Sequence, residues 1–134
     1  MQERVTTAGI LVRGGKYLIA KREEKGAIGG LWEFPGGKNR YSETEEETLK
    51  REFMEELGIP ITVGSLVHTH DFTNKDTQYH LKAYWVTAPL SMDFSLTVHS
   101  EYRWVRLDEL ESFAFAPSDQ AIVKTLLSGK NMQD

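Results

Sequence analysis

Residues 36–59 read "GGKNRYSETEEETLKREFMEELGI", and this stretch carries the strongest structural pattern in the chain. Its apolar residues recur at helical spacing and form one stripe: Leu49, Phe53 and Leu57. A stripe of this kind marks a helix that packs one side against a core. We therefore predict a helix from about Glu43 or Thr44 to Leu57, with Gly58 as its C-cap.

Charged residues in the middle of this helix form pairs that suit a solvent-exposed surface. Glu46 with Lys50 and Glu47 with Arg51 stand four residues apart, in the orientation that stabilises isolated helices. An acidic, solvated helix explains this part of the sequence without any ligand.

The last turns contain glutamates that a solvated helix does not explain. Glu52, Glu55 and Glu56 are spaced so that they share one side, next to the apolar stripe. Glu52 and Glu56 repel each other, lack a cation three or four residues away in the helix, and oppose the helix dipole near its C-terminus. A hard divalent cation with oxygen ligands, Mg²⁺ or Mn²⁺, would compensate these charges.

The spacing of these residues reproduces a known family motif. Gly37, five residues, Glu43 and seven residues precede "REFMEELGI", which fills the rest of the Nudix box: Arg51, Glu52, Phe53, Glu55, Glu56, Gly58 and Ile59. The chain resembles a Nudix hydrolase of the small MutT type, and "LWEFPGGK" and "FAPSD" extend the resemblance over nearly the whole chain. Within that type, "APSD" and "HLKAYWV" are more similar to the CTP pyrophosphohydrolase branch.

The resemblance implies hydrolysis of a nucleoside diphosphate linked to another group, with divalent metal at the pyrophosphate. It assigns metal ligands to the carbonyl of Gly37 and to the carboxylates of Glu52, Glu55 and Glu56. Glu52 is also the expected base that orients water, and Arg51 is expected to position the carboxylates through Glu55. Gly58 and Glu43 take supporting roles, although Glu43 is equally interpretable as an acidic residue favoured by the helix dipole.

Four residues that are not fixed positions of the box are candidates for contact with phosphates or water. By the same resemblance, Glu101 in "TVHSEYRWV" is either an extra ligand or base, or an exposed strand-edge glutamate. Lys38 directly follows two glycines and is a phosphate candidate, although these glycines lack the spacing of a Walker P-loop. Lys21 and Arg22 are weaker phosphate candidates, because basic residues at a strand end are common on plain surfaces.

Asp119 in "FAPSD" is the candidate for reading the nucleobase. The corresponding position in enzymes specific for oxidised guanine nucleotides looks like an asparagine, so Asp119 departs from that pattern. An ionised carboxylate only accepts hydrogen bonds, which favours an amino group such as that of cytosine. Alternatively, Asp119 caps the last helix. Phe34 belongs to a set of aromatic residues that either stack on a base or form the core: Trp32, Phe34, Tyr84, Trp85 and Trp104.

Three histidines fall in the predicted strands. His68 and His70 alternate onto one strand face and His80 lies on the next strand. We interpret them as polar residues of a half-exposed sheet rather than as metal ligands.

The rest of the sequence predicts an α+β fold in one domain spanning residues 1–134. Apolar runs on either side of Gly14-Gly15 indicate a β-hairpin, and the glycine-rich "EEKGAIGGLWEFPGGKNRYSE" is interpreted as a long loop. Strands are expected in "ITVGSLVHTH", "QYHLKAYWV" and "EYRWVRL", and a helix from about Asp119 to Leu127 with Ser118 as its N-cap. The family resemblance implies a mixed sheet sandwiched between helices, an α/β/α arrangement.

Composition narrows the class of protein. The 134 residues carry a formal net charge of -4. This charge argues against broad electrostatic binding of duplex DNA or RNA, so any nucleotide ligand is expected to be small. The absence of cysteine excludes disulfides, thiolate metal sites and cysteine nucleophiles. The N-terminus is unlike a signal peptide and no apolar run reaches membrane-spanning length, so we expect a cytoplasmic protein without a membrane partner. The sequence is compatible with a monomer and with a homodimer.

These patterns support one leading hypothesis, a metal-dependent nucleoside triphosphate pyrophosphohydrolase that releases a nucleoside monophosphate and diphosphate. Its expected substrates are cytosine or modified nucleotides of the nucleotide pool. The alternatives are an 8-oxo-dGTP diphosphatase of the MutT type and a hydrolase of another nucleoside diphosphate compound. A non-catalytic Nudix-like binding module is disfavoured, because a pure binder need not retain self-repelling glutamates.

Overall fold

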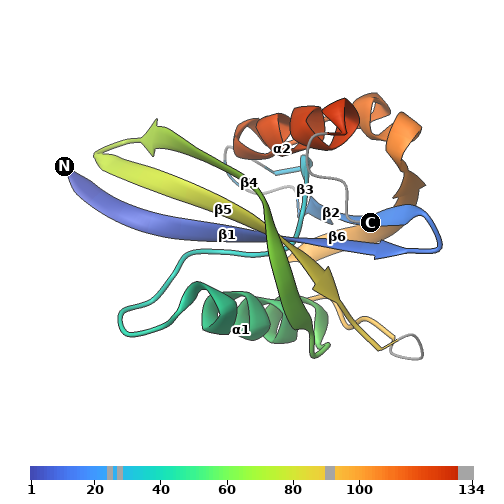
Figure 1. The fold of residues 1–134 in the computed structure, drawn as a ribbon, viewed down its shortest axis with the longest axis horizontal. Helices are drawn as coiled ribbons and strands as arrows, with labels where there is room; N and C mark the ends of the chain where they lie inside the picture. The colour runs from blue at the N-terminus through green and yellow to red at the C-terminus, as the bar shows by residue number, and fades with distance from the viewer. Residues whose placement is uncertain (24–25, 27–28, 90–92, 130–134) are drawn as a thin grey trace.

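The computed structural model describes residues 1–23, 26, 29–89 and 93–129. Figure 1 shows a twisted sheet with α1 and α2 on opposite sides of it, the expected α/β/α arrangement. Within the described residues, no helix combines the length and the apolar character needed to cross a membrane. The elements in chain order are β1 (Gln2–Arg13), β2 (Lys16–Arg22), β3 (Trp32–Glu33), α1 (Glu45–Leu57), β4 (Thr62–Asn74), β5 (Thr77–Thr87), β6 (His99–Arg106), the 3₁₀ helix η1 (Leu107–Ser112) and α2 (Pro117–Ser128).

The sheet is mixed, and its centre is a parallel pair of strands that lie far apart in the sequence. β1 and β5 stay in register from Gln2 opposite Thr77 to Leu11 opposite Val86. β4 continues the sheet beyond β5, whereas β2 meets only the end of β1 and pairs along its length with β6. The strand order is β3-β2-β1-β5-β4, with β6 also on β2. The long β1 therefore belongs to both halves of the sheet.

The predicted hairpin between β1 and β2 is confirmed. Arg13 pairs with Lys16 across a two-residue turn. Gly14 and Gly15 have φ angles of 59° and 77°, a backbone region that glycine adopts without a steric penalty. Two successive positive φ angles are typical of the tight hairpin turn that matches strand twist.

Each face of the sheet carries its own apolar core. Because side chains alternate along a strand, Ile10 of β1 lies in the core under α2 and its neighbour Leu11 lies in the core under α1. The predicted stripe of α1 is fully buried in the second of these cores: Leu49, Phe53 and Leu57. The first core contains the buried side of α2: Ile122, Val123 and Leu126.

The ends of α1 are capped as its sequence allows. The Thr44 hydroxyl accepts from the Glu47 N–H, and the Glu47 carboxylate accepts from the Thr44 N–H, which forms a capping box. Gly58 has a φ of 72° and closes the helix, as predicted. The helix begins at Glu45, one or two residues after the predicted start, because Thr44 acts as the cap.

The two predicted surface ion pairs of α1 have different outcomes. Glu46 and Lys50 form theirs, with 2.9 Å between Oε2 and Nζ. The expected pair of Glu47 with Arg51 is wrong: Glu47 is engaged in the capping box, and Arg51 turns to other carboxylates.

Two further expectations are corrected near α2. The segment interpreted as one long loop contains the short strand β3, which pairs with the end of β2. The last helix begins at Pro117, and Ser118 is not its N-cap; Ala116 holds that position without a side-chain hydrogen bond. Proline suits the first helical position because it has no N–H to satisfy there. The Ser118 hydroxyl instead donates to the Asp119 carboxylate.

Candidate active site

The box glutamates lie where α1 meets the loop that precedes it. The Glu52 carboxylate packs so closely on Gly37 that a side chain at position 37 would overlap it. Gly36 donates its N–H to Glu56. Gly37 is thus needed to bring the loop backbone against the helix, and Gly36 to bring it against β1. The Gly37 carbonyl, expected as a metal ligand, accepts from both the N–H of Thr7 at 2.8 Å and its hydroxyl at 2.9 Å, so in this arrangement it is held by β1.

Arg51 connects the acidic residues on one flank of the site. Its Nε lies 2.6 Å from Glu43 Oε2, and its Nη1 lies 3.1 Å from Glu55 Oε1 and 3.3 Å from Glu52 Oε1. Nη2 also donates to the carbonyl of Lys38 at 3.1 Å. Arg51 therefore ties helix and loop together, and its hydrogen bonds lower the pKa of Glu43 to about 2.

The two glutamates facing inward are electrostatically unfavourable as anions. Burial, followed by a hydrogen bond to Glu55, raises the pKa of Glu52 to about 7, with Arg51 opposing the shift. Burial raises the pKa of Glu56 to about 9, and the nearby charges of Glu33 and Glu52 add to the shift. Glu56 Oε1 is buried and has no hydrogen-bond partner among the described residues. Carboxylates in this condition fit a divalent cation, which would stabilise their ionised form.

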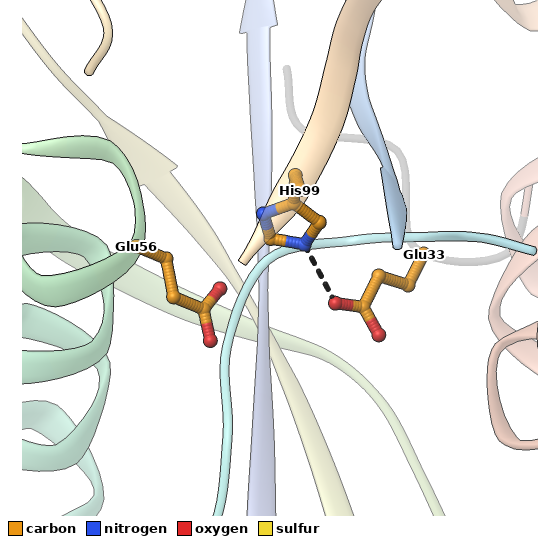
Figure 2. Close-up of side chains that lie close together, drawn as sticks. All are labelled: Glu33, Glu56 and His99. Carbon is orange, nitrogen blue, oxygen red and sulfur yellow. Dashed lines mark hydrogen bonds and ion pairs between the residues drawn. The ribbon is translucent and has the colours of Figure 1, made fainter. Parts of the chain in front are cut away.

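The structure brings two residues to Glu56 that sequence reasoning missed. Glu33 of β3 and His99 of β6 lie beside it, with one ligand atom of each residue within 4.8 Å of the others. Figure 2 shows the two carboxyl groups approaching the His99 ring from opposite sides. Glu33 lay in the quoted "LWEFPGGK" and His99 in "TVHSEYRWV", but no local pattern joins residues so far apart.

The candidates Glu101 and Lys21, and the three histidines interpreted as sheet residues, have partners other than the box glutamates. Glu101, the candidate for an extra ligand or base, accepts from Arg103 Nε at 3.1 Å on an exposed surface. Lys21 lies in β2, where its backbone is in register with Trp32 of β3 on one side and with Glu101 of β6 on the other. His68 and His70 bond to each other at 2.8 Å, and His80 lies between Asp71 and Glu3. These three histidines form ordinary side-chain hydrogen bonds on the sheet.

A cavity of about 530 Å³ opens next to the glycine loop and gathers several candidates. Its lining includes Arg22, Phe34, Lys38 and Asp119, together with Glu33. Lys38 Nζ lies 5.4 Å from the ring centre of Tyr79, and Arg22 Nη1 lies 3.6 Å from Glu33 Oε2. Cations, apolar surface and a buried carboxylic acid thus line one space.

Asp119 is not a helix cap but lies within the first turn of α2. Its Oδ2 accepts from the N–H of Phe34 at 2.8 Å, which ties α2 to the glycine loop. Burial raises the pKa of Asp119 to about 7. The acceptor-only character expected of an ionised Asp119 therefore applies above about pH 7. The Phe34 ring is buried and stacks on Phe115, with 5.4 Å between ring centres.

The profile of the NUDIX domain family matches residues 7–125. The chain belongs to the Nudix domain family. This assignment confirms the resemblance drawn from the box, and the fold agrees with it.

Named relatives of this Nudix chain cover most of its length. CTP pyrophosphohydrolase of Escherichia coli (strain K12) is 34% identical over 125 residues, which span 90% of this chain and 89% of the relative. Putative 8-oxo-dGTP diphosphatase 2 of Mycobacterium tuberculosis is 34% identical over 129 residues, 94% of this chain and 89% of the relative.

Solved structures agree with the sequence comparison. The solution structure of the E. coli ORF135 protein matches with a TM-score of 0.83 and 32% identity, over 96% of this chain and 91% of that one. The MutT NUDIX hydrolase from Burkholderia pseudomallei matches with a TM-score of 0.81 and 25% identity, over 94% and 99%.

Proposed function

We propose that this protein is a metal-dependent nucleoside triphosphate pyrophosphohydrolase, which converts a nucleoside triphosphate to the monophosphate and diphosphate. The observation that carries the proposal is the pair of half-buried Glu52 and buried Glu56, two acids with raised pKa values beside a cavity whose lining includes Arg22 and Lys38. Family membership and both named relatives support hydrolysis of nucleotide phosphoanhydrides. The ligand is a small nucleotide, and a cytoplasmic location stays a prediction.

The box residues take distinct roles in this proposal. Glu52, Glu55 and Glu56 hold Mg²⁺, or Mn²⁺ in its place, which supplies neutralisation of the phosphate charge and activation of water. Glu52 accepts the proton of the attacking water, since the bound cation and the Arg51 guanidinium, 3.3 Å away, favour its ionised form. Arg51, itself anchored by Glu43, positions Glu52 and Glu55. Lys38 and Arg22 are the phosphate contacts within the cavity.

The chemistry of Asp119 indicates which nucleobase the substrate carries. An ionised Asp119 accepts from the amino group of cytosine, in line with the CTP-hydrolysing relative. The second candidate substrate is 8-oxo-dGTP, named for another relative. Its favouring observation is the raised pKa of Asp119, because a protonated carboxyl group donates to a guanine carbonyl.

Two measurements test the proposed activity. Diphosphate release from a panel of canonical and oxidised nucleotides is expected with Mg²⁺ and to disappear with excess chelator. Glu52→Gln is expected to lower kcat by orders of magnitude while the fold persists, because shape is kept and charge is lost. Glu46→Gln on the exposed side of the same helix is the matched control and retains activity. Hydrolysis that continues undiminished in chelator would refute the metal-dependent mechanism.

A further inference from the structure

His99, Glu33 and Glu56 come from three separate elements and meet inside the protein. His99 begins β6, Glu33 ends β3 and Glu56 lies in the last turn of α1. The His99 side chain is fully buried, and Glu56 is 7% exposed. Figure 2 shows the imidazole standing between the two carboxyl groups. Burying one histidine between two acids is costly unless each polar atom has a partner.

Only one nitrogen of His99 has such a partner in the part of the chain that the structure describes. Nε2 lies 2.8 Å from Glu33 Oε2, and this hydrogen bond assigns the ring proton to Nε2 because a carboxylate can only accept. Nδ1 is then an acceptor with a free lone pair. Among the described residues, His99 Nδ1 and Glu56 Oε1 are the only buried side-chain polar atoms without a hydrogen-bond partner. Both belong to this one cluster.

Protonation of both nitrogens would not resolve this arrangement. A charged His99 would offset the acidic neighbours, but in this arrangement its Nδ1–H would be a buried donor with no described acceptor in hydrogen-bonding geometry, because Glu56 Oε1 is itself left unpaired. An unmet buried donor destabilises a protein by about 1–3 kcal/mol. The neutral ring, with Nε2–H donated to Glu33, leaves a lone pair that a cation can use.

A carboxylate that accepts from one nitrogen of a histidine, while the other nitrogen binds a metal, is a recurrent arrangement in metalloproteins. The Glu33–His99 pair has this form. Imidazole nitrogen favours first-row transition metals over Mg²⁺, which prefers oxygen ligands. Ligands at about 2.0–2.2 Å from a metal lie roughly 3–4 Å apart. One ligand atom of each of the three residues lies within 4.8 Å of the other two, so the cluster is already compact on the scale of a metal site.

We propose that His99 Nδ1 and Glu56 Oε1 bind a first-row transition-metal dication such as Co²⁺ or Zn²⁺, with Glu33 holding the imidazole in place. This inference deepens the proposed function, because Glu56 is shared with the Mg²⁺ ligands. It assigns to the protein a mixed nitrogen and oxygen position next to an all-oxygen one. His99 is accordingly the residue that determines metal selectivity.

The test is metal binding to the nucleotide-free protein. Calorimetric titrations with Co²⁺, Zn²⁺ and Mg²⁺ are made on the wild type, His99→Gln, Glu33→Gln and the control His80→Gln. His80 also contacts two carboxylates, Asp71 and Glu3, but on an exposed surface. We expect His99→Gln to reduce the ratio of Co²⁺ to Mg²⁺ affinity at least tenfold, Glu33→Gln to reduce it less, and His80→Gln to leave it unchanged. An unchanged ratio in His99→Gln would overturn the proposal.

A second measurement does not depend on any variant folding. In ¹⁵N-histidine spectra of the wild type, His99 is expected as the Nε2–H tautomer, and its Nδ1 resonance should shift on addition of Zn²⁺. A ring protonated at both nitrogens near neutral pH, or a Nδ1 resonance indifferent to Zn²⁺, would show that the cluster is an ion-pair network instead.

These experiments separate this inference from the proposed activity. If His99→Gln loses its selectivity for Co²⁺ and Zn²⁺ and the wild type hydrolyses nucleotides with Mg²⁺, both the metal site and the proposed function are supported. A wild type that binds Co²⁺ through His99 but hydrolyses no nucleotide would refute the proposed function and keep the metal site. A wild type that hydrolyses nucleotides but shows no metal selectivity dependent on His99 would keep the proposed function and refute the metal site.

Discussion

At the scale of single residues, Glu56 is the most informative group in the chain. It is nearly inaccessible to water, faces Glu33 and Glu52, and has a pKa raised to about 9. In the unfolded chain the same carboxyl titrates near its ordinary value of about 4.3. The folded protein therefore binds one more proton than the unfolded chain between these two pKa values, so folding stability falls as pH rises through that window.

This sign leads to a prediction for Glu56→Gln. Without metal, the wild type should lose stability between about pH 5 and pH 9, by at most about 1.4 kcal/mol per pH unit for this group. The variant should show a flatter profile and a higher Tm than the wild type at about pH 8. Thermal unfolding in chelator across this pH range measures both. A Glu56→Gln protein that melts markedly lower than the wild type at about pH 8 would mean that the carboxylate is structural.

Asp119 is the second residue whose protonation matters near neutral pH. Asp119→Asn keeps an oxygen for the Phe34 N–H and adds a permanent donor. We expect preference to shift from CTP towards 8-oxo-dGTP by about 1–3 kcal/mol, roughly 5- to 150-fold in relative kcat/KM. In the wild type, the preference for CTP should increase with pH through about pH 7, as the carboxyl ionises.

The measurement is kcat/KM for CTP and 8-oxo-dGTP on both proteins at several pH values. Equal losses of kcat/KM for both nucleotides would mean that Asp119 only holds the Phe34 backbone and does not contact the nucleobase. A wild type that already prefers 8-oxo-dGTP above about pH 7 would contradict the acceptor role of the ionised side chain.

At the scale of elements, α1 depends on its N-terminal cap and its attachment to the preceding loop. The capping box of Thr44 and Glu47 satisfies N–H groups that the helix itself cannot. Arg51 then fastens the second turn of the helix to Glu43 and Lys38 of the loop. The glutamates near the other end are repelling charges, so the helix is stabilised where it begins and carries function where it ends.

Thr44→Ala tests this division. Removal of the cap should lower the free energy of unfolding by about 0.5–2 kcal/mol. Glu46→Gln, which breaks the exposed pair with Lys50, should change it by less than about 1 kcal/mol. Chemical denaturation of both variants makes the comparison. Equal effects of the two substitutions would show that the capping box does not stabilise α1.

At the scale of the whole molecule, the active site is assembled by the close approach of α1 to the sheet. Gly9 of β1 lies directly under Phe53, and a Cβ at position 9 would come within 2.5 Å of the Phe53 ring. Phe53 is itself fully buried. The depth at which α1 sits, and hence the place of its neighbours Glu52 and Glu56, is set partly by this missing side chain.

Gly9→Ala should therefore act on stability and on the site together. Overpacking of a full core typically destabilises by about 1–3 kcal/mol. We expect a lower Tm and a weaker response of activity to Mg²⁺. Addition of Phe53→Leu to Gly9→Ala should recover part of both losses, because the smaller side chain makes room. A double variant whose losses are simply additive would show that the two residues do not determine the depth of α1.

The parts of this protein that the sequence predicted are those with local causes. The helix of residues 45–57, its Gly58 cap and the glycine hairpin follow from periodicity and from backbone preferences over a few residues. The box glutamates were recognisable because like charges on one helical side require an explanation. Where side chains had several partners to choose from, as Glu47 and Arg51 did, local spacing chose the wrong one.

Only the tertiary structure decided which distant residues share the site. β3 exists because β2 offers it a pairing edge, and this pairing carries Glu33 to His99, 66 residues away in sequence. Asp119 likewise meets Phe34 across 85 residues and acquires its raised pKa from burial there. Burial and long-range pairing depend on the packing of whole elements, and no short segment encodes them. The sequence of α1 therefore determines which carboxylates the helix carries. The fold determines which residues surround these carboxylates and how far their pKa values are shifted.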